Sequence, residues 1–280
     1  MDSFSYRRTY DGPVKAVLLD WDGTIVDYGS NASVRAITEL FRQRGVEVRM
    51  PLIRATMGTS HKCQLEAIAD LDQVALQWEQ IHGCYPTQRD VYTLYRELVP
   101  LQTDILSSYG KPIPGALETI KSLRGMGIKI GTTSAYTGEL QRRFSAEAGR
   151  HGFEPDTSIC PENVPSGRPQ PWMCLKAAME LQIFPMEALV KIGDTVPDIE
   201  EGLNAGMWTV GIAKTGNEVG LTEEDLDQLT PVDRNTRIIK AREKLSRCGA
   251  HFVVDSLDEV PQIIELINSR QSETVRHKFI

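Results

Sequence analysis

A short apolar run that ends abruptly in acidic residues is the feature that most constrains this sequence. Residues 16–19 read Ala-Val-Leu-Leu, which has the length and composition of a strand buried on both faces of a parallel sheet. Asp20 follows directly, and Asp22 and Gly23 come just after it. Open α/β sheets bind ligands outside the carboxyl ends of their strands, so acidic residues at this point predict a binding or catalytic edge.

After Asp27 the sequence changes from a strand pattern to a helical one. Val34, Ile37 and Leu40 repeat at helical spacing, and no comparable strand appears before Gly115. This pattern predicts an all-helical cap domain over residues 28–109, inserted into an α/β core formed by residues 1–27 and 110–280. Helices are expected at about 34–45, 60–69, 73–82 and 87–108.

From residue 110 onward, helical and strand patterns alternate, as a doubly wound parallel sheet requires. The fold class is therefore predicted to be α/β, with a Rossmann-like core. Strands are expected at 128–133, 157–160, 189–192, 208–212 and 251–254. Helices are expected at 115–126, 138–149, 171–182, 197–205, 221–247 and 257–269, with frayed residues from about Ser269.

Composition narrows the classes of function. The net charge of −7 argues against a nucleic-acid surface and against binding to anionic membranes. We identify no signal peptide and no long apolar span, so neither secretion nor membrane insertion is expected. The five cysteines are scattered and odd in number, which is typical of reduced thiols in a cytoplasmic protein.

Two further polar positions lie where the first motif predicts partners. Ser134 follows the strand predicted at 128–133, and a hydroxyl group there is able to bind phosphate oxygens. Arg168 stands between Gly167 and Pro169, and its cation would neutralise a nucleophile and an incoming phosphate. Each signal is weak alone, because strands often end in Ser or Thr and loop arginines are commonly exposed.

The pair Asp194 and Asp198 is a stronger signal. Both acids lie at the junction between the strand 189–192 and the following helix. Mg²⁺ prefers oxygen ligands from one or two carboxylates, water and substrate phosphate. An N-cap role is an alternative for Asp198, but that role does not explain Asp194.

Residues 20–24, Asp-Trp-Asp-Gly-Thr, resemble the Asp-x-Asp-Gly-Thr motif of the haloacid dehalogenase superfamily. The resemblance implies that Asp20 is a nucleophile that takes up a phosphoryl group, and that Asp22 is a general acid and base. It assigns Ser134 and Arg168 to the phosphate oxygens. The implied cofactor is Mg²⁺, held by Asp20, the backbone carbonyl of Asp22 and Asp194, with Asp198 in support.

Over most of its length the chain resembles the phosphonoacetaldehyde hydrolase family within this superfamily. That family cleaves a P–C bond after a cap lysine forms a Schiff base with the aldehyde, and its members are homodimers, so the resemblance also implies a homodimer. The stretches that carry it are residues 20–29, Met57-Gly58, 167–173, 191–195, 204–211, 218–224 and 249–252.

Two departures from that family concern the chemistry. The family motif Met-Gly-x-x-Lys begins at Met57, but its lysine position holds His61, and Lys62 follows one residue later. On a helix, one residue turns a side chain by about 100° around the axis. The family usually carries Ala where this chain has Asp22, whereas most phosphatases of the superfamily carry Asp there to protonate the leaving group.

These departures favour a Mg²⁺-dependent phosphohydrolase that cleaves a P–O bond of a small phosphorylated metabolite. One alternative is a genuine phosphonoacetaldehyde hydrolase in which Lys62 forms the imine. Another is a non-catalytic relative that binds a phosphometabolite. His61 is expected either to bind a phosphate or hydroxyl group or to lie at the seam between cap and core.

Overall fold

A six-stranded parallel sheet forms the centre of the larger part of the molecule. The structure is a computed structural model that describes residues 10–276, apart from the side chains of residues 106–108 and 273–276. The strands lie in the order β3-β2-β1-β4-β5-β6, and each adjacent pair is parallel. They are β1 (Ala16–Leu19), β2 (Lys129–Thr133), β3 (Thr157–Ile159), β4 (Leu189–Gly193), β5 (Trp208–Ile212) and β6 (Phe252–Val254). The predicted α/β core is confirmed.

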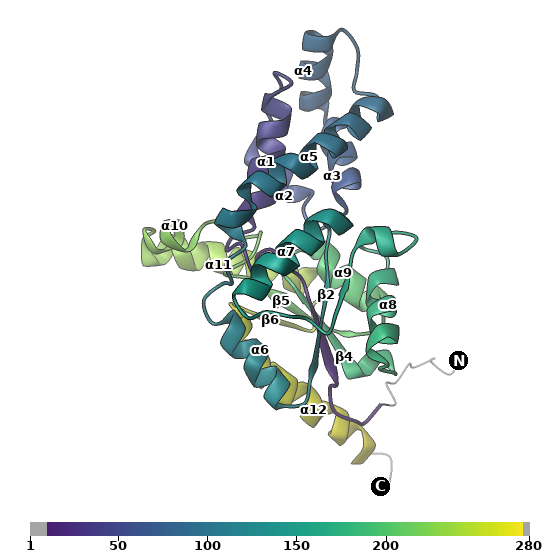
Figure 1. Cartoon of the computed structure of the whole chain (residues 1–280). Coiled ribbons are helices and arrows are strands. Elements are labelled where there is room, and N and C mark those ends of the chain that lie inside the picture. The colour runs from purple at the N-terminus through teal and green to yellow at the C-terminus, as the bar shows by residue number, and fades with distance from the viewer. Residues whose placement is uncertain (1–9, 277–280) are drawn as a thin grey trace, which may run out of the picture.

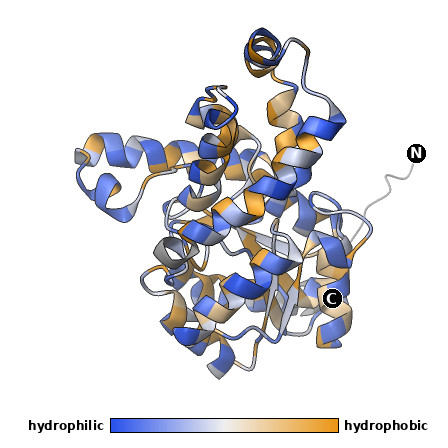
Figure 2. Ribbon diagram, turned by 45° about the horizontal axis from the view of Figure 1, so that its top comes forward, coloured by the Kyte–Doolittle hydropathy of each residue, from blue (hydrophilic) through white to orange (hydrophobic). Residues whose placement is uncertain are grey.

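Helices cover both faces of this sheet, because successive strand residues point to opposite sides. Val17 and Leu19 pack with α6, α7 and α12, whereas Ala16 and Leu18 pack with α8. Figure 2 shows that hydrophobic and hydrophilic residues are mixed along the helices of the molecule, as helices that cover a sheet require. The helices are α6 (Ala116–Gly125), α7 (Gly138–Arg150), α8 (Trp172–Leu181), α9 (Val196–Asn204), α10 (Glu223–Asp227), α11 (Pro231–Arg247) and α12 (Val260–Arg276).

The strand order reverses at β1, which pairs with β2 on one side and with β4 on the other. All strands are parallel, so their carboxyl ends lie at one edge of the sheet. Asp20, Ser134 and Asp194 follow β1, β2 and β4, respectively. The topology therefore brings these three residues to the switch point of the sheet, where doubly wound folds bind their ligands.

Five helices between β1 and β2 form a separate bundle, which we call the cap bundle. Its helices are α1 (Asn31–Arg42), α2 (Met50–Ala55), α3 (His61–Ala69), α4 (Asp72–His82) and α5 (Gln88–Tyr109). Figure 1 shows the bundle at one end of the sheet. Phe41, Leu65 and Leu94 lie in a hydrophobic cluster made by the bundle itself. The predicted helical insertion is thus confirmed, and the boundaries near residues 28 and 110 stay a prediction.

Three helical segments differ from the sequence-based expectation. Helix α2 was not predicted, because it is short and has Pro51 in its first turn, where proline is tolerated. The stretch 221–247 is divided into α10 and α11. Helix α12 continues to Arg276 instead of fraying at Ser269, and the Gln271 amide donates a 2.8 Å hydrogen bond to the Glu187 carbonyl. Within residues 10–276, no helix combines the length and hydropathy needed to span a membrane.

Candidate active site

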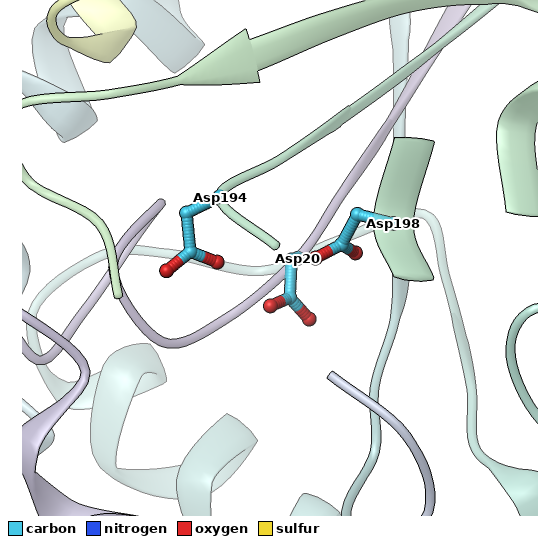
Figure 3. A group of neighbouring side chains, drawn as sticks. All are labelled: Asp20, Asp194 and Asp198. Carbon is cyan, nitrogen blue, oxygen red and sulfur yellow. The ribbon is translucent and has the colours of Figure 1, made fainter. Parts of the chain in front are cut away.

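Three aspartates meet at the carboxyl edge of the sheet. Asp20 follows β1, Asp194 follows β4 and Asp198 lies in the first turn of α9 (Figure 3). One carboxylate oxygen of each lies within 4.8 Å of those of the other two, and all three residues are buried. Buried carboxylates at this separation repel one another, so a cation between them would relieve the repulsion.

Asp194 is held in place through one oxygen only. Its Oδ2 atom accepts hydrogen bonds from Ser30 Oγ (2.7 Å) and from the backbone N–H of Asn217 (2.6 Å). Its Oδ1 atom is buried and has no hydrogen-bond partner among the described residues. Burial raises the pKa of Asp194 well above its usual range, and the negative charge of Asp20 raises it further. An oriented carboxylate with one free buried oxygen fits a divalent cation.

Asp198 differs from Asp194, because both of its oxygens already have partners. Oδ1 lies 2.6 Å from Lys191 Nζ and 2.9 Å from Arg168 Nη1, and Oδ2 accepts from the backbone and hydroxyl of Thr195. Burial alone would raise the pKa of Asp198, but the two adjacent cations lower it. Asp198 is therefore an ionised carboxylate that orients cations and caps α9.

Arg168 connects the three clustered aspartates to Glu201 and to the end of β2. Its Nη2 donates to Asp20 Oδ1 (2.8 Å) and to the Thr133 carbonyl (2.7 Å), and its Nε donates to Glu201 (3.1 Å). Glu201 and Lys191 are buried as well, and their charged atoms lie 3.7 Å apart. Since an unpaired buried charge is costly, the two cations and the carboxylates hold one another in place.

Asp22 has a different environment from the other acids. The hydroxyl of Tyr136 donates to its carboxylate at 2.5 Å, and the Tyr136 ring stacks on Phe144 with its centroid 4.5 Å away. Burial raises the pKa of Asp22 well above its usual range, the charge of Asp27 adds to this effect, and the Tyr136 hydrogen bond opposes it. A carboxyl group with a raised pKa retains a proton that it is able to donate.

The cap bundle forms the opposite wall of a small cavity of about 30 Å³. His61 lines this cavity and is buried, whereas Lys62 is exposed and lies outside the lining. Met57 also lines it, and its sulfur lies 3.1 Å from the Gln64 amide nitrogen. The lining consists of Asp20, Trp21, Asp22, Ser30, Ser33, Met57, Gly58, Thr59, His61, Gln64, Ser134, Ala135, Tyr136, Arg168, Asp194 and Thr195.

Two contacts hold the cap bundle close to the core. Arg54 of α2 donates to the carbonyls of Gly29 (2.9 Å) and Gly220 (2.8 Å) and to Asn217 Oδ1 (3.1 Å). Gly58 passes so close to the core that an added Cβ would collide with Oγ1 of Thr195. The bundle therefore lies closed over the acid cluster.

The structure brings the candidate core residues together. Ser134 lines the cavity together with Asp20, Asp22, Arg168 and Asp194. The Ser134 Oγ atom accepts a 2.8 Å hydrogen bond from the Tyr136 N–H, so the hydroxyl hydrogen of Ser134 is available to a ligand. Of the residue at the family's lysine position, His61, and the lysine that follows it, Lys62, only His61 lines the cavity. Sequence reasoning missed the residues that support the site, which are Ser30, Arg54, Gln102, Tyr136, Lys191, Glu201 and Asn217.

Comparison with known proteins finds similar sequences over nearly the whole chain. Residues 14–206 match the family model of the haloacid dehalogenase-like hydrolases. The chain is 43% identical over 273 residues to a protein named phosphonoacetaldehyde hydrolase from Syntrophobacter fumaroxidans (strain DSM 10017 / MPOB), a match that covers 98% of this chain and 99% of that relative. It is 41% identical to a phosphonoacetaldehyde hydrolase-like protein of the same organism, over 96% of this chain and 97% of that relative.

Solved structures give the same result. The crystal structure of a phosphonoacetaldehyde hydrolase-like protein from Oleispira antarctica matches with a TM-score of 0.93 and 36% identity, over 97% of this chain and 98% of that chain. A putative phosphoglycolate phosphatase from Lactobacillus delbrueckii subsp. bulgaricus matches with a TM-score of 0.66 and 21% identity, over 90% and 98% of the two chains. The second likeness concerns the fold alone.

Proposed function

The chain belongs to the haloacid dehalogenase-like hydrolases, in the group related to phosphonoacetaldehyde hydrolase, and we propose that it is a Mg²⁺-dependent phosphohydrolase that cleaves P–O bonds. The proposed substrate is a small phosphorylated metabolite. The observation that carries this proposal is the pair formed by Asp20 and Asp22 in a cavity whose lining contains no lysine. P–O cleavage needs a proton for the departing oxygen, whereas an imine route needs an amine.

The residues support a two-step displacement. Arg168 holds Oδ1 of Asp20, and the other oxygen, Oδ2, forms a bond to phosphorus while the bond from phosphorus to the leaving oxygen breaks. Asp22 gives its proton to that oxygen. The resulting Asp22 carboxylate then takes a proton from water, which attacks phosphorus and releases phosphate from Asp20.

Two groups would hold the phosphate oxygens during both steps. Ser134 offers its hydroxyl hydrogen and Arg168 its positive charge. Asp20, the Asp22 carbonyl and Asp194 are the proposed protein ligands of Mg²⁺, and Asp198 supports them through Lys191 and Arg168. When bound, the ion would neutralise negative charge on the phosphoryl group and the acid cluster.

The resemblance to phosphonoacetaldehyde hydrolase leaves a second candidate. The 43% identity to a protein of that name favours P–C cleavage, for which Lys62 would have to move from its exposed position into the cavity. A non-catalytic phosphometabolite-binding protein is the third candidate. We also propose, on the resemblance alone, that the protein is a cytoplasmic homodimer.

A substrate panel tests these candidates. Purified protein is incubated with small phosphate monoesters and with phosphonoacetaldehyde, in Mg²⁺ and after chelation with EDTA. We expect Mg²⁺-dependent phosphate release from the esters, and its loss in Asp20→Asn. Borohydride trapping with phosphonoacetaldehyde that is present in the wild type and lost in Lys62→Ala would establish the second candidate. Tight binding of esters without turnover would establish the third.

A further inference from the structure

The charged side chains in the cavity all lie on one side. Asp20, Asp22, Asp194 and Arg168 belong to the core. The cap wall that faces them consists of uncharged side chains, namely Ser33, Met57, Thr59, His61 and Gln64. The phosphate end of a substrate would meet the core, so its organic end would meet a neutral wall.

His61 contributes the ring in this cap wall, and a buried hydrogen bond with Gln102 holds that ring in place. The amide nitrogen of Gln102 lies 3.1 Å from His61 Nε2 and 3.2 Å from Ser33 Oγ. An amide N–H that donates to Nε2 leaves the hydrogen of the neutral ring on Nδ1. The Nδ1 atom is buried and has no partner among the described residues. Burial lowers the pKa of His61 to about 4, so the ring is uncharged at neutral pH.

From this arrangement we propose that His61 selects the substrate class, and that the class is a phosphate monoester with a small, uncharged organic group that bears a hydroxyl or carbonyl oxygen. This inference rests on the proposed phosphohydrolase function. The oxygen accepts a hydrogen bond from His61 Nδ1–H, which otherwise stays unpaired in a buried site.

The same wall excludes charged organic groups. A carboxylate on the organic end of the substrate would be buried against the cap wall without a counter-charge, because Arg168, the one lysine or arginine of the lining, lies on the core side with Asp20, Asp198 and Glu201. An ammonium group would place N–H donors against the N–H donor of His61.

Four phosphate monoesters with a common two-carbon frame test this inference. They are 2-hydroxyethyl phosphate, ethyl phosphate, O-phosphoethanolamine and 2-phosphoglycolate, and they differ only in the terminal group. We expect kcat/KM to be highest for 2-hydroxyethyl phosphate. Ethyl phosphate, which lacks the acceptor, should be about tenfold poorer. The two charged esters should be poorer on the order of a hundredfold.

A matched pair of variants assigns the preference to the histidine. His61→Leu replaces the imidazole by an apolar side chain of similar size that has no N–H donor, and it should abolish the tenfold advantage of 2-hydroxyethyl phosphate over ethyl phosphate. Cys63→Leu places the same side chain at an exposed position of the same helix and should leave the ratio unchanged. A ratio that persists in His61→Leu would overturn the assignment.

The outcomes separate this inference from the function on which it rests. Wild-type enzyme that hydrolyses 2-phosphoglycolate or O-phosphoethanolamine as well as 2-hydroxyethyl phosphate overturns the inference and leaves the phosphohydrolase intact. Activity on larger esters with none on these four likewise overturns only the inference. Absence of turnover on every phosphate monoester removes the function and the inference with it.

Discussion

Tyr136 donates its phenolic hydrogen bond to the carboxyl group of Asp22, and this contact joins the loop after β2 to the loop after β1. The Tyr136 ring stacks on Phe144 and lies next to the tilted ring of His61, with ring centroids 4.5 and 5.4 Å away. A single aromatic residue therefore orients the proposed general acid and borders the cap wall. It is a positioning residue in the sense that it acts through Asp22.

Asp22→Asn should slow the transfer of the phosphoryl group to Asp20, and it should do so more strongly for leaving groups that need a proton. A positioned acid typically contributes about 10²–10⁴ in rate, so kcat/KM for an alkyl phosphate should fall by that range. The loss should be much smaller for p-nitrophenyl phosphate, because its phenolate leaves without a proton. Tyr136→Phe retains the acid and should cost about tenfold on the alkyl ester. Equal losses of Asp22→Asn on both esters would contradict the acid role.

The buried neutral His61 should make stability fall in mild acid. Its pKa is about 4 in the folded protein, below the ordinary value of 6.5, so the unfolded chain binds a proton first as the pH falls. The contribution of His61 to stability is complete above pH 6.5 and is lost between pH 6.5 and 4. Between pH 7 and 5 this amounts to about 2 kcal/mol of unfolding free energy.

Urea unfolding at pH 7 and pH 5 measures this contribution. His61→Gln should lose about 2 kcal/mol less than the wild type over the same interval. His82→Gln, at an exposed position, should behave as the wild type. An unchanged pH difference in His61→Gln would show that the ring is not held neutral.

Arg54 should couple closure of the cap to the acid cluster. Its guanidinium binds Asn217, whose backbone N–H orients Asp194, so removing it frees both the cap and Asp194. Arg54→Met should lower kcat/KM by about 10–100-fold and raise the Mg²⁺ concentration for half-maximal activity. Arg54→Lys should retain more of the wild-type kcat/KM than Arg54→Met but not all of it, because an ammonium group cannot reproduce the planar set of N–H donors of a guanidinium. Arg49→Met, an exposed change at the N-cap position of the same helix, should have no effect.

Lys191 should be essential for stability, unlike a lysine in a surface pair. It is buried between Asp198 and Glu201, so Lys191→Met leaves two carboxylates without that partner and should cost about 3–5 kcal/mol of unfolding free energy. Lys244 pairs with Glu218 near the surface, so Lys244→Met should lower the unfolding free energy by less than about 1 kcal/mol. Urea unfolding at pH 7 compares the two, and similar losses would contradict the argument.

The parts of the site that the sequence predicted share one property. Asp20, Ser134 and Asp194 each follow a strand of a parallel sheet, and the carboxyl ends of such strands meet at one edge whatever the details of packing. Arg168 is the exception among these predictions, since it follows no strand. It lies beside Asp20 because Glu201 and Asp198 hold its guanidinium in the core.

The missed residues depend on contacts that no local pattern encodes. Arg54 and Asn217 lie in different parts of the chain, and neither stands in a recognisable motif. Two of the missed residues did carry a signal. Lys191 is a charged residue within the otherwise apolar strand β4. Glu201 lies one turn after Asp198, so these two carboxylates face the same side of α9. A buried lysine in a strand needs a buried acid, and Glu201 is a candidate because it lies on the same face of α9 as Asp198.

The close approach of Gly58 to Thr195 has a consequence for how the sequence is able to vary. The hydroxyl of Thr195 is engaged by Asp198, so Thr195 is not free to become smaller and make room for a side chain across the seam. A methyl group at position 58 would push the cap bundle away from the core and keep the cavity open. Glycine at that position is therefore required twice, by its own left-handed backbone (φ +93°) and by the helix cap in the other half of the molecule, so a smaller residue at position 195 alone would not permit a side chain at position 58.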